Sequence, residues 1–200
     1  MIDDLDRSLE VLLTHELPPA LVQQVTITFL APDSQFPPTS VPLPAIDLFL
    51  YDVRDNHELR SAEWTTIRQP DGRILKAPPS ARVDCAYLIT AWTSSSSTTP
   101  AFDEHHVLGE VMQVLLRHRT LPTPVLQGVL ADQEVPPPTT SLQPGSLRSL
   151  SEFWQLLGGK PKATLNFTVT ISVPVGAPRP VGPPATDARL TLAASSDNSR

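Results

Sequence analysis

The stretch from Arg82 to His118 constrains the fold most, because it contains the two patterns that a helix-covered sheet requires. Between 82 and 92, apolar residues occupy both faces of an extended chain, which is typical of a central strand covered on both sides. Farther on, Leu108, Val111, Met112 and Leu115 recur at helical spacing. The stretch therefore predicts a buried strand, a polar loop and an amphipathic helix that packs on the sheet.

The other apolar patterns predict an α/β (α+β) fold, with a sheet of about five to six strands and two to three helices. We expect a helix at 2–16, a short helix at 150–157, and strands at 21–30, 45–54, 58–68, 125–135 and 163–173. The strands at 45–54 and 58–68 are expected to form a hairpin through 55–57, and Asp71 and Gly72 mark a second turn. The segment at 125–135 is expected at an edge of the sheet.

Proline-rich segments separate these predicted elements, and the last of them marks the end of the folded part. The chain has 23 prolines against 8 glycines, and the prolines cluster between the apolar segments. After residue 174 the sequence contains too little apolar bulk to form a core. We therefore predict one domain at 1–174 and a proline-rich, flexible tail at 175–200.

Charge and cysteine content exclude several classes of function. Fifteen basic and 21 acidic side chains give a net charge of −6, so the broad basic footprint of a nucleic-acid-binding protein is absent. Cys85 is the sole cysteine, which excludes an intramolecular disulfide and a cysteine-based zinc cage and is compatible with a reducing, cytoplasmic compartment. The N-terminal segment lacks the features of a signal peptide, and no apolar run is long enough to span a bilayer, so no membrane contact is expected.

Two groups of residues are candidates for a reactive or metal-binding site. His106 and Glu110 are four residues apart and could share a helical face with His105 nearby, but a metal site needs further ligands. A histidine pair that caps the helix, packs or meets a neighbouring subunit is the favoured interpretation. Cys85 lies within an apolar strand, so a small buried hydrophobe is favoured over a nucleophile. No catalytic, cofactor-binding or metal-binding residue is predicted.

The charged hairpin tip and the histidine pair form instead a candidate interface with another subunit or partner. The strand at 45–54 carries bulky residues on both faces, which suggests partial burial by a second protein. The candidate interface residues are Tyr51, Arg54, Asp55, Asn56, His57, Glu58, Arg60, His105 and His106.

Several phrases of the sequence together resemble a known family. They include MIDDLDRSLEVLL, LFLYDVRDNHELR, RVDCAYLITAW, EHHVLGEVMQVLLR, LQGVL and SEFWQLLGGKPKATLNFTVTISV. The set resembles the cap, or tail-terminator, proteins of extracellular contractile injection systems, which are phage-tail-like particles of the antifeeding-prophage and virulence-cassette type. The resemblance covers roughly residues 1–174. The chain differs from longer relatives of this family in its proline-rich tail and in the serine/threonine-rich insertion at 93–99.

This resemblance implies a mixed β-sheet with helices packed on it and a structural role without enzymatic activity. It implies a homo-oligomeric ring, with a hexamer expected, that binds the inner tube protein and the sheath protein and ends their polymerisation. The protein would then lie in the cytoplasm of the producing cell, within a particle that can be released. Two alternatives stay open: a small metal-dependent hydrolase using His105, His106 and Glu110, and an effector-loading adaptor of the same particles.

Overall fold

The protein divides into two compact units, which are described separately. The computed structural model describes residues 1–32, 37–94, 96–133, 135–143, 152, 154–155 and 161–181. The first unit comprises Met1–Arg60 and Ser80–Val173, and the second comprises Ser61–Pro79 and Pro174–Arg200.

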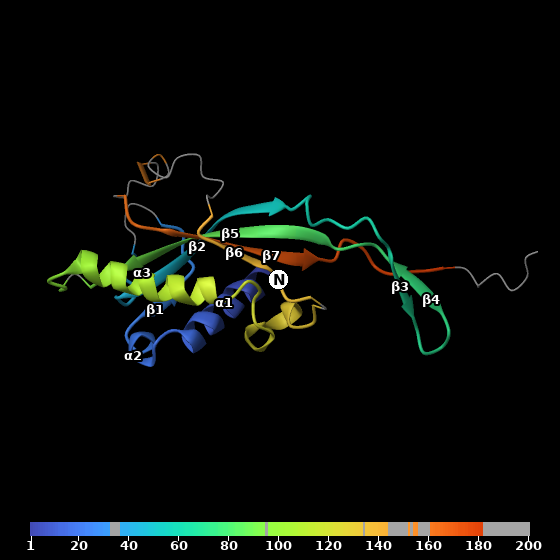
Figure 1. The fold of residues 1–200 in the computed structure, drawn as a ribbon, viewed down its shortest axis with the longest axis horizontal. Helices are drawn as coiled ribbons and strands as arrows, with labels where there is room; N and C mark the ends of the chain where they lie inside the picture. The colour runs from blue at the N-terminus through green and yellow to red at the C-terminus, as the bar shows by residue number, and fades with distance from the viewer. Residues whose placement is uncertain are drawn as a thin grey trace, which may run out of the picture. The chain divides into compact units, whose positions relative to one another are not determined.

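A five-stranded mixed sheet forms the centre of the first unit (Figure 1). Its strands, in spatial order, are β1 (Thr26–Thr28), β2 (Ala45–Asp55), β5 (Ala81–Trp92), β7 (Leu165–Val173) and β6 (Thr139–Ser141). β1 and β2 are parallel, whereas the other neighbouring strands are antiparallel. The predicted mixed sheet, the central position of the strand after Arg82 and the strand ending near 173 are confirmed.

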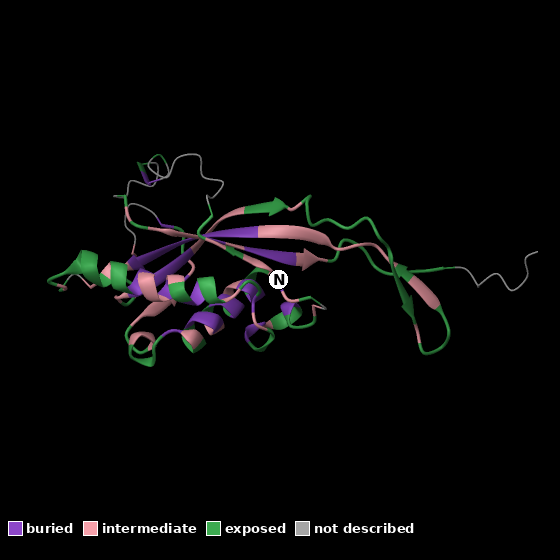
Figure 2. Ribbon diagram, viewed as in Figure 1, coloured by how far each residue is buried: buried purple, intermediate pink, exposed green. Residues whose placement is uncertain are grey.

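Helices cover one face of this sheet. α1 (Ile2–Glu16) and α3 (Pro100–Arg117) pack there, and the four-residue α2 (Pro19–Val22) follows α1 (Figure 1). Leucines of α1 and apolar residues of α3 form one cluster with the inward side chains of β2, β5 and β7, and this cluster is the core of the unit (Figure 2). Both predicted long helices are therefore confirmed.

The middle of β5 is buried on both faces, as its sequence pattern predicts. Cys85, Tyr87 and Ile89 belong to the core beneath the helices, and Leu88 and Thr90 on the other face are also buried. Trp154 is buried as well. Most of the short helix predicted at 150–157 lies outside the described residues.

The predicted strand at 21–30 is only partly correct. Pro19 at the start of α2 begins a helical turn, because its fixed φ suits the first helical position. The strand proper is limited to β1, which spans Thr26–Thr28. The alternating pattern from Leu21 onward therefore overestimated the length of the strand.

The predicted hairpin joining 45–54 to 58–68 is wrong. β2 instead pairs with β1 along one edge and with β5 along the other. Residues 65–68 form β3 (Thr65–Arg68), which pairs with β4 (Ile74–Ala77) around the second predicted turn. Gly72 has a φ of 83°, which a glycine adopts without a steric penalty, so this turn can be tight.

The predicted edge strand at 125–135 is also wrong. That segment forms two 3-10 turns, η1 (Thr123–Val125) and η2 (Gly128–Leu130), which pack their apolar residues against α1. The edge strands of the sheet are β1 and β6, and β6 follows a run of three prolines. The residues at 125, 126 and 130 are buried, as their apolar character predicts, but their backbone does not form a strand.

The second unit contains a three-stranded antiparallel sheet in the order β3-β4-β8, with β8 at Arg179–Pro180. The predicted boundary near residue 174 stays a prediction; β8 lies beyond it, within the segment predicted as a tail. Residues 182–200 lie outside the described part of the chain. In the described residues, no helix is both long and apolar enough to cross a membrane.

Candidate subunit interface

Two of the predicted interface residues are held within the first unit. The side-chain amide of Asn56 donates to both carboxylate oxygens of Asp84, at 3.0 Å each, and its backbone N–H donates to the carbonyl of Arg82 at 2.7 Å. The hydroxyl of Thr170 on β7 donates to the same carboxylate at 2.5 Å. Tyr51 is half-buried, and its hydroxyl donates to Asn166 at 3.4 Å. Asp84 therefore fixes the chain where it leaves β2.

The charged side chains on either side of Asn56 are exposed to solvent. The carboxylate of Asp55 accepts a hydrogen bond from Arg60 at 2.9 Å and lies 3.8 Å from Nδ1 of His57. Arg54 pairs with Asp52 at 2.6 Å, and Glu58 is exposed. Exposed ion pairs of this kind stabilise a fold by less than about 1 kcal/mol, so these side chains can change partners at little cost.

His105 and His106 lie on the exposed side of the first turns of α3. Sequence analysis missed Phe102, whose side chain is 77% exposed, more than any other large apolar side chain in the described residues. Phe102 precedes the buried Val111 by two and a half turns, so it lies on the opposite side of the helix. Residues three and four apart are neighbours on a helix, so Phe102, His105 and His106 form one patch, here called the α3 patch.

The register of the sheet keeps these two groups of residues apart. Asp55 pairs with Val83 near the start of β5, whereas Trp92 at its end leads through the loop into α3. Nine residues of extended chain span about 30 Å. The structure therefore does not gather the predicted residues into one site. It places them at two ends of the same unit.

Neither group has the arrangement of a metal centre. In the described parts of the chain, no group of three or more His, Cys, Asp and Glu side chains could hold a metal ion. Glu110 is partly exposed on α3, near the histidines in sequence but without a further ligand among the described residues. The hypothesis of a metal-dependent hydrolase thus gains no support from this geometry.

Cys85 has the environment of a core residue. Its side chain is buried within β5, and this burial raises the pKa of its thiol to about 11. A thiol that is protonated at neutral pH is a poor nucleophile. The interpretation of Cys85 as a small buried hydrophobe is confirmed.

The three tryptophans differ in their exposure. Trp154 is buried, whereas Trp64 is 49% exposed. Trp92 is half-buried, and the ammonium of Lys162 lies 3.9 Å from the centre of its ring. Lys162 also pairs with Glu104 of α3 at 2.6 Å, which connects the start of β7 to this helix.

The fold places the chain in the class of two-layer proteins in which helices cover one face of a mixed sheet. The chain belongs to the Pvc16 N-terminal domain family, whose model matches residues 4–187.

Two solved structures share this fold over almost the whole chain. One is the sheath/tube terminator of PVC, an extracellular contractile injection system, in its extended state. It matches with a TM-score of 0.69 and 26% identity over 100% of this chain and 65% of that chain. The other is the tube-terminating cap of the anti-feeding prophage, which matches with a TM-score of 0.68 and 26% identity over 96% and 61%.

The chain therefore spans about two thirds or less of the length of these structures. Among curated proteins, none matches it significantly. The predicted family and the predicted terminator-like fold are confirmed by the family match and by the shared structure.

Proposed function

We propose that this protein is a structural cap of a contractile injection system, which binds the last layer of the tube and sheath and ends their polymerisation. The observation that carries this proposal is the shared fold with two terminators over at least 96% of the chain. Both relatives are structural proteins by description, so we infer a role without catalysis. The inner tube protein and the sheath protein are the expected partners.

The cap acts as a closed homo-oligomeric ring, with a hexamer as the expected state. A ring needs two different surfaces on each subunit, because every contact is head-to-tail. The charged segment at 54–60 and the α3 patch lie toward opposite ends of β5, so they offer a ring two different surfaces of one subunit. Assembly takes place in the cytoplasm of the producing cell, before the particle is released.

Deletion of the coding sequence tests the proposal directly. Without a terminator, we expect tubes and sheaths of uncontrolled length or unstable particles in electron micrographs, and normal length after complementation with the wild-type chain. Particles of normal length and stability in the deletion strain would refute the cap function. An adaptor that only loads effectors would leave length unchanged and reduce the cargo content.

Complementation with a surface variant then tests the α3 patch. Phe102→Ser removes an exposed aromatic group, which at interfaces is a frequent source of binding energy. Leu116→Ser is the matched control, because Leu116 is 55% exposed in the last turns of the same helix. We expect Phe102→Ser to restore length control less well than Leu116→Ser. Equal restoration would exclude the patch from the interface.

A further inference from the structure

The three-stranded sheet of the second unit has two faces of different chemistry. The register pairs Thr66 with Lys76, Arg68 with Ile74, and Lys76 with Arg179, and cross-strand partners share a face. One face therefore carries three cations and no acidic residue. Thr65, Ile67, Leu75, Ala77 and Pro180 form the opposite, uncharged face.

The described residues of this sheet are all exposed or only half-buried (Figure 2). None of them belongs to the hydrophobic core, so the sheet lacks a covering layer of its own. An isolated sheet of two or three short strands is marginally stable without packing on one face. This sheet therefore has the properties of an element that is completed by a partner.

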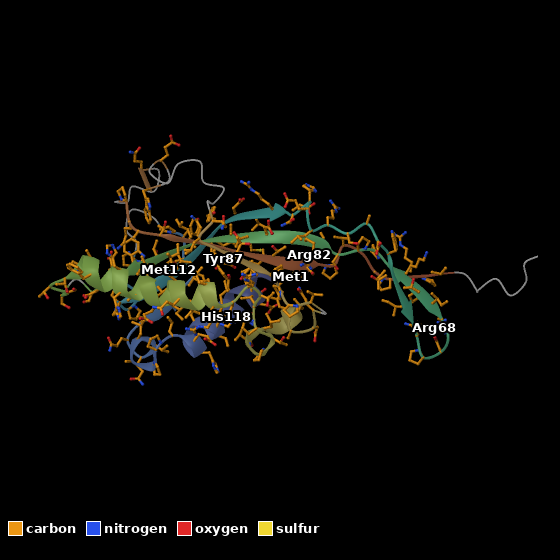
Figure 3. All side chains as sticks on the ribbon, viewed as in Figure 1. Met1, Arg68, Arg82, Tyr87, Met112 and His118 are labelled. Carbon is orange, nitrogen blue, oxygen red and sulfur yellow. The ribbon has the colours of Figure 1, made fainter. Side chains whose placement is uncertain are left out.

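Its cations are available for such a partner. Arg68, labelled on β3 in Figure 3, Lys76 and Arg179 form no ion pair with any described residue. Arg73 is the exception among the basic residues here, because it pairs with Asp71 at the hairpin turn, at 3.3 Å. The basic face thus consists of Arg68, Lys76 and Arg179.

The two units of the chain have opposite net charges. Residues 61–79 and 174–200 contain six basic and four acidic side chains, a net charge of +2. Residues 1–60 and 80–173 contain 9 basic and 17 acidic side chains, a net charge of −8. Complementary charges of this size direct association and favour one partner over another.

We propose that the basic face of the β3-β4-β8 sheet docks on the acidic first unit of a second copy of this chain. The inference rests on the proposed ring and assigns one of its contacts to Arg68, Lys76 and Arg179. Each copy contributes a basic sheet and an acidic body, so the contact is head-to-tail and repeats around a ring. A nucleic acid is the less suitable occupant, because the −8 charge of the attached unit repels a polyanion.

The test uses the purified full chain and measures its oligomeric state by analytical ultracentrifugation between 50 and 500 mM salt. We expect oligomers whose dissociation constant rises with salt, because exposed charges are screened. In the triple variant Arg68→Gln, Lys76→Gln, Arg179→Gln, the loss of three charge pairs should raise the dissociation constant at least about tenfold. The salt series of the wild-type chain tests the same contact without any substitution.

A matched control removes the same charge from the first unit. Arg7, Arg117 and Arg119 are exposed, and their replacement by glutamine lowers the net charge equally. This control should oligomerise at least as well as the wild-type chain, since it makes the acidic surface more negative. Circular dichroism and thermal unfolding compare the folding of both variants.

Three results would overturn the contact. They are a wild-type chain that stays monomeric at all salt concentrations, oligomers insensitive to salt, and a triple variant that associates like the control. If that triple variant also forms particles of normal length, the docking contact is wrong while the cap function stands. Loss of tube binding with unchanged self-association would assign the basic face to the tube instead.

Discussion

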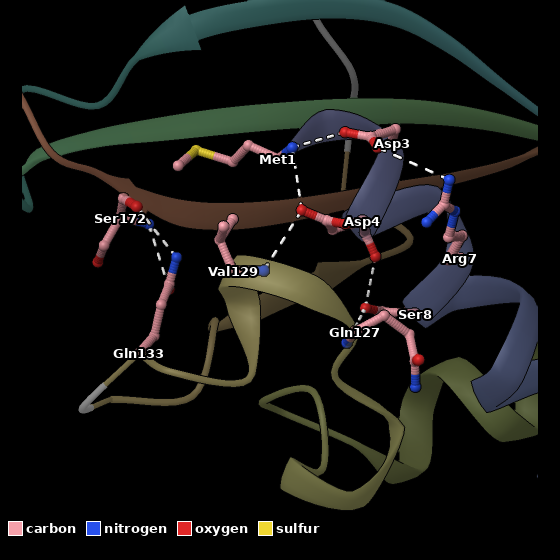
Figure 4. Close-up of polar contacts among 9 residues, drawn as sticks. All are labelled: Met1, Asp3, Asp4, Arg7, Ser8, Gln127, Val129, Gln133 and Ser172. Atoms are coloured by element: carbon pink, nitrogen blue, oxygen red, sulfur yellow. Dashed lines mark hydrogen bonds and ion pairs between the residues drawn. The ribbon is translucent and has the colours of Figure 1, made fainter.

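Gly128 and Asp4 approach each other so closely that a β-carbon on the glycine would lie 2.1 Å from Oδ1 of the aspartate. The same carboxylate accepts a hydrogen bond from the backbone of Val129 at 3.4 Å and pairs with the terminal amine at 3.0 Å (Figure 4). One turn along α1, Ser8 donates to the carbonyl of Asp4 and accepts from the backbone of Gln127. These contacts join α1 to the η1–η2 segment.

Replacement of Gly128 by alanine should therefore destabilise the protein. Gly128 has a φ of +55°, which costs an alanine about 1 kcal/mol, and the contact with Asp4 adds a steric penalty. We expect the free energy of unfolding to fall by about 2 to 4 kcal/mol, measured by urea denaturation. Gly109→Ala is the matched control: Gly109 lies in α3 with nothing within 4 Å of the new methyl group, so about 0.5 to 1 kcal/mol should be gained. Equal effects at both positions would contradict the close approach.

Asp47 should make the protein less stable as pH rises. Its side chain is fully buried on β2, Oδ1 accepts a hydrogen bond from Leu30 at 3.1 Å, and Oδ2 has no partner among the described residues. Burial raises the pKa of this carboxyl to about 8. Because the folded state then binds a proton more tightly than the unfolded state, stability falls between about pH 4 and pH 8, by at most about 1.4 kcal/mol per unit.

Asp47→Asn tests this dependence, because an amide keeps the acceptor for Leu30 and cannot ionise. We expect the variant to lose the downward slope between pH 5 and pH 8 and to exceed the wild-type stability at pH 8, both measured by urea unfolding. Asp55→Asn, at an exposed carboxylate, should leave that slope in place. Parallel curves for the wild type and Asp47→Asn would show that Asp47 is not the cause.

Thr170→Val should weaken the anchor that holds Asn56. The substitution preserves shape but leaves Asp84 without the 2.5 Å hydrogen bond from the hydroxyl. We expect a loss of about 1 to 3 kcal/mol in chemical denaturation, because the acceptor is charged and partly buried. Thr168→Val, two residues away on the same face of β7, should cost less than about 0.5 kcal/mol. A smaller effect at 170 than at 168 would be incompatible with this anchor.

Cys85 should react with a thiol reagent only when the protein unfolds. Its side chain is fully buried and its thiol has a pKa of about 11, so access and ionisation are both unfavourable at pH 8. We expect negligible colour development with an aromatic disulfide reagent in buffer and one equivalent in 6 M urea. Rapid reaction of the folded protein would contradict the position of Cys85 in the core.

Local sequence patterns identified the elements whose burial follows from their own periodicity. Alternation along 163–173 and the helical spacing of Leu108, Val111 and Leu115 are set within a few residues, so β7 and α3 were predicted correctly. The apolar residues on both faces of β5 also indicated its central position. The sequence segments that resemble terminator proteins also indicated the family.

Pairing between distant segments could not be read from the sequence. β2 pairs with β5, more than 25 residues away, whereas the nearer segment at 65–68 pairs with β4 in the other sheet. Similarly, the apolar residues at 125, 126 and 130 are buried in or beside 3-10 turns, and Gly128 between them has a positive φ and lies close to Asp4. Periodicity reports which residues are buried but not the partner that buries them.

The interface residues show the same division. The sequence by itself determined that the charged segment at 54–60 and the pair His105 and His106 are polar and exposed. Only the tertiary structure decided that they lie toward opposite ends of β5, whose residues from Val83 to Trp92 span about 30 Å. It also decided that Arg68, Lys76 and Arg179 share one face, because β8 comes from a segment about 100 residues farther along the chain and pairs with β4. Side-chain chemistry is local, whereas the surface on which it acts is made by contacts between distant strands.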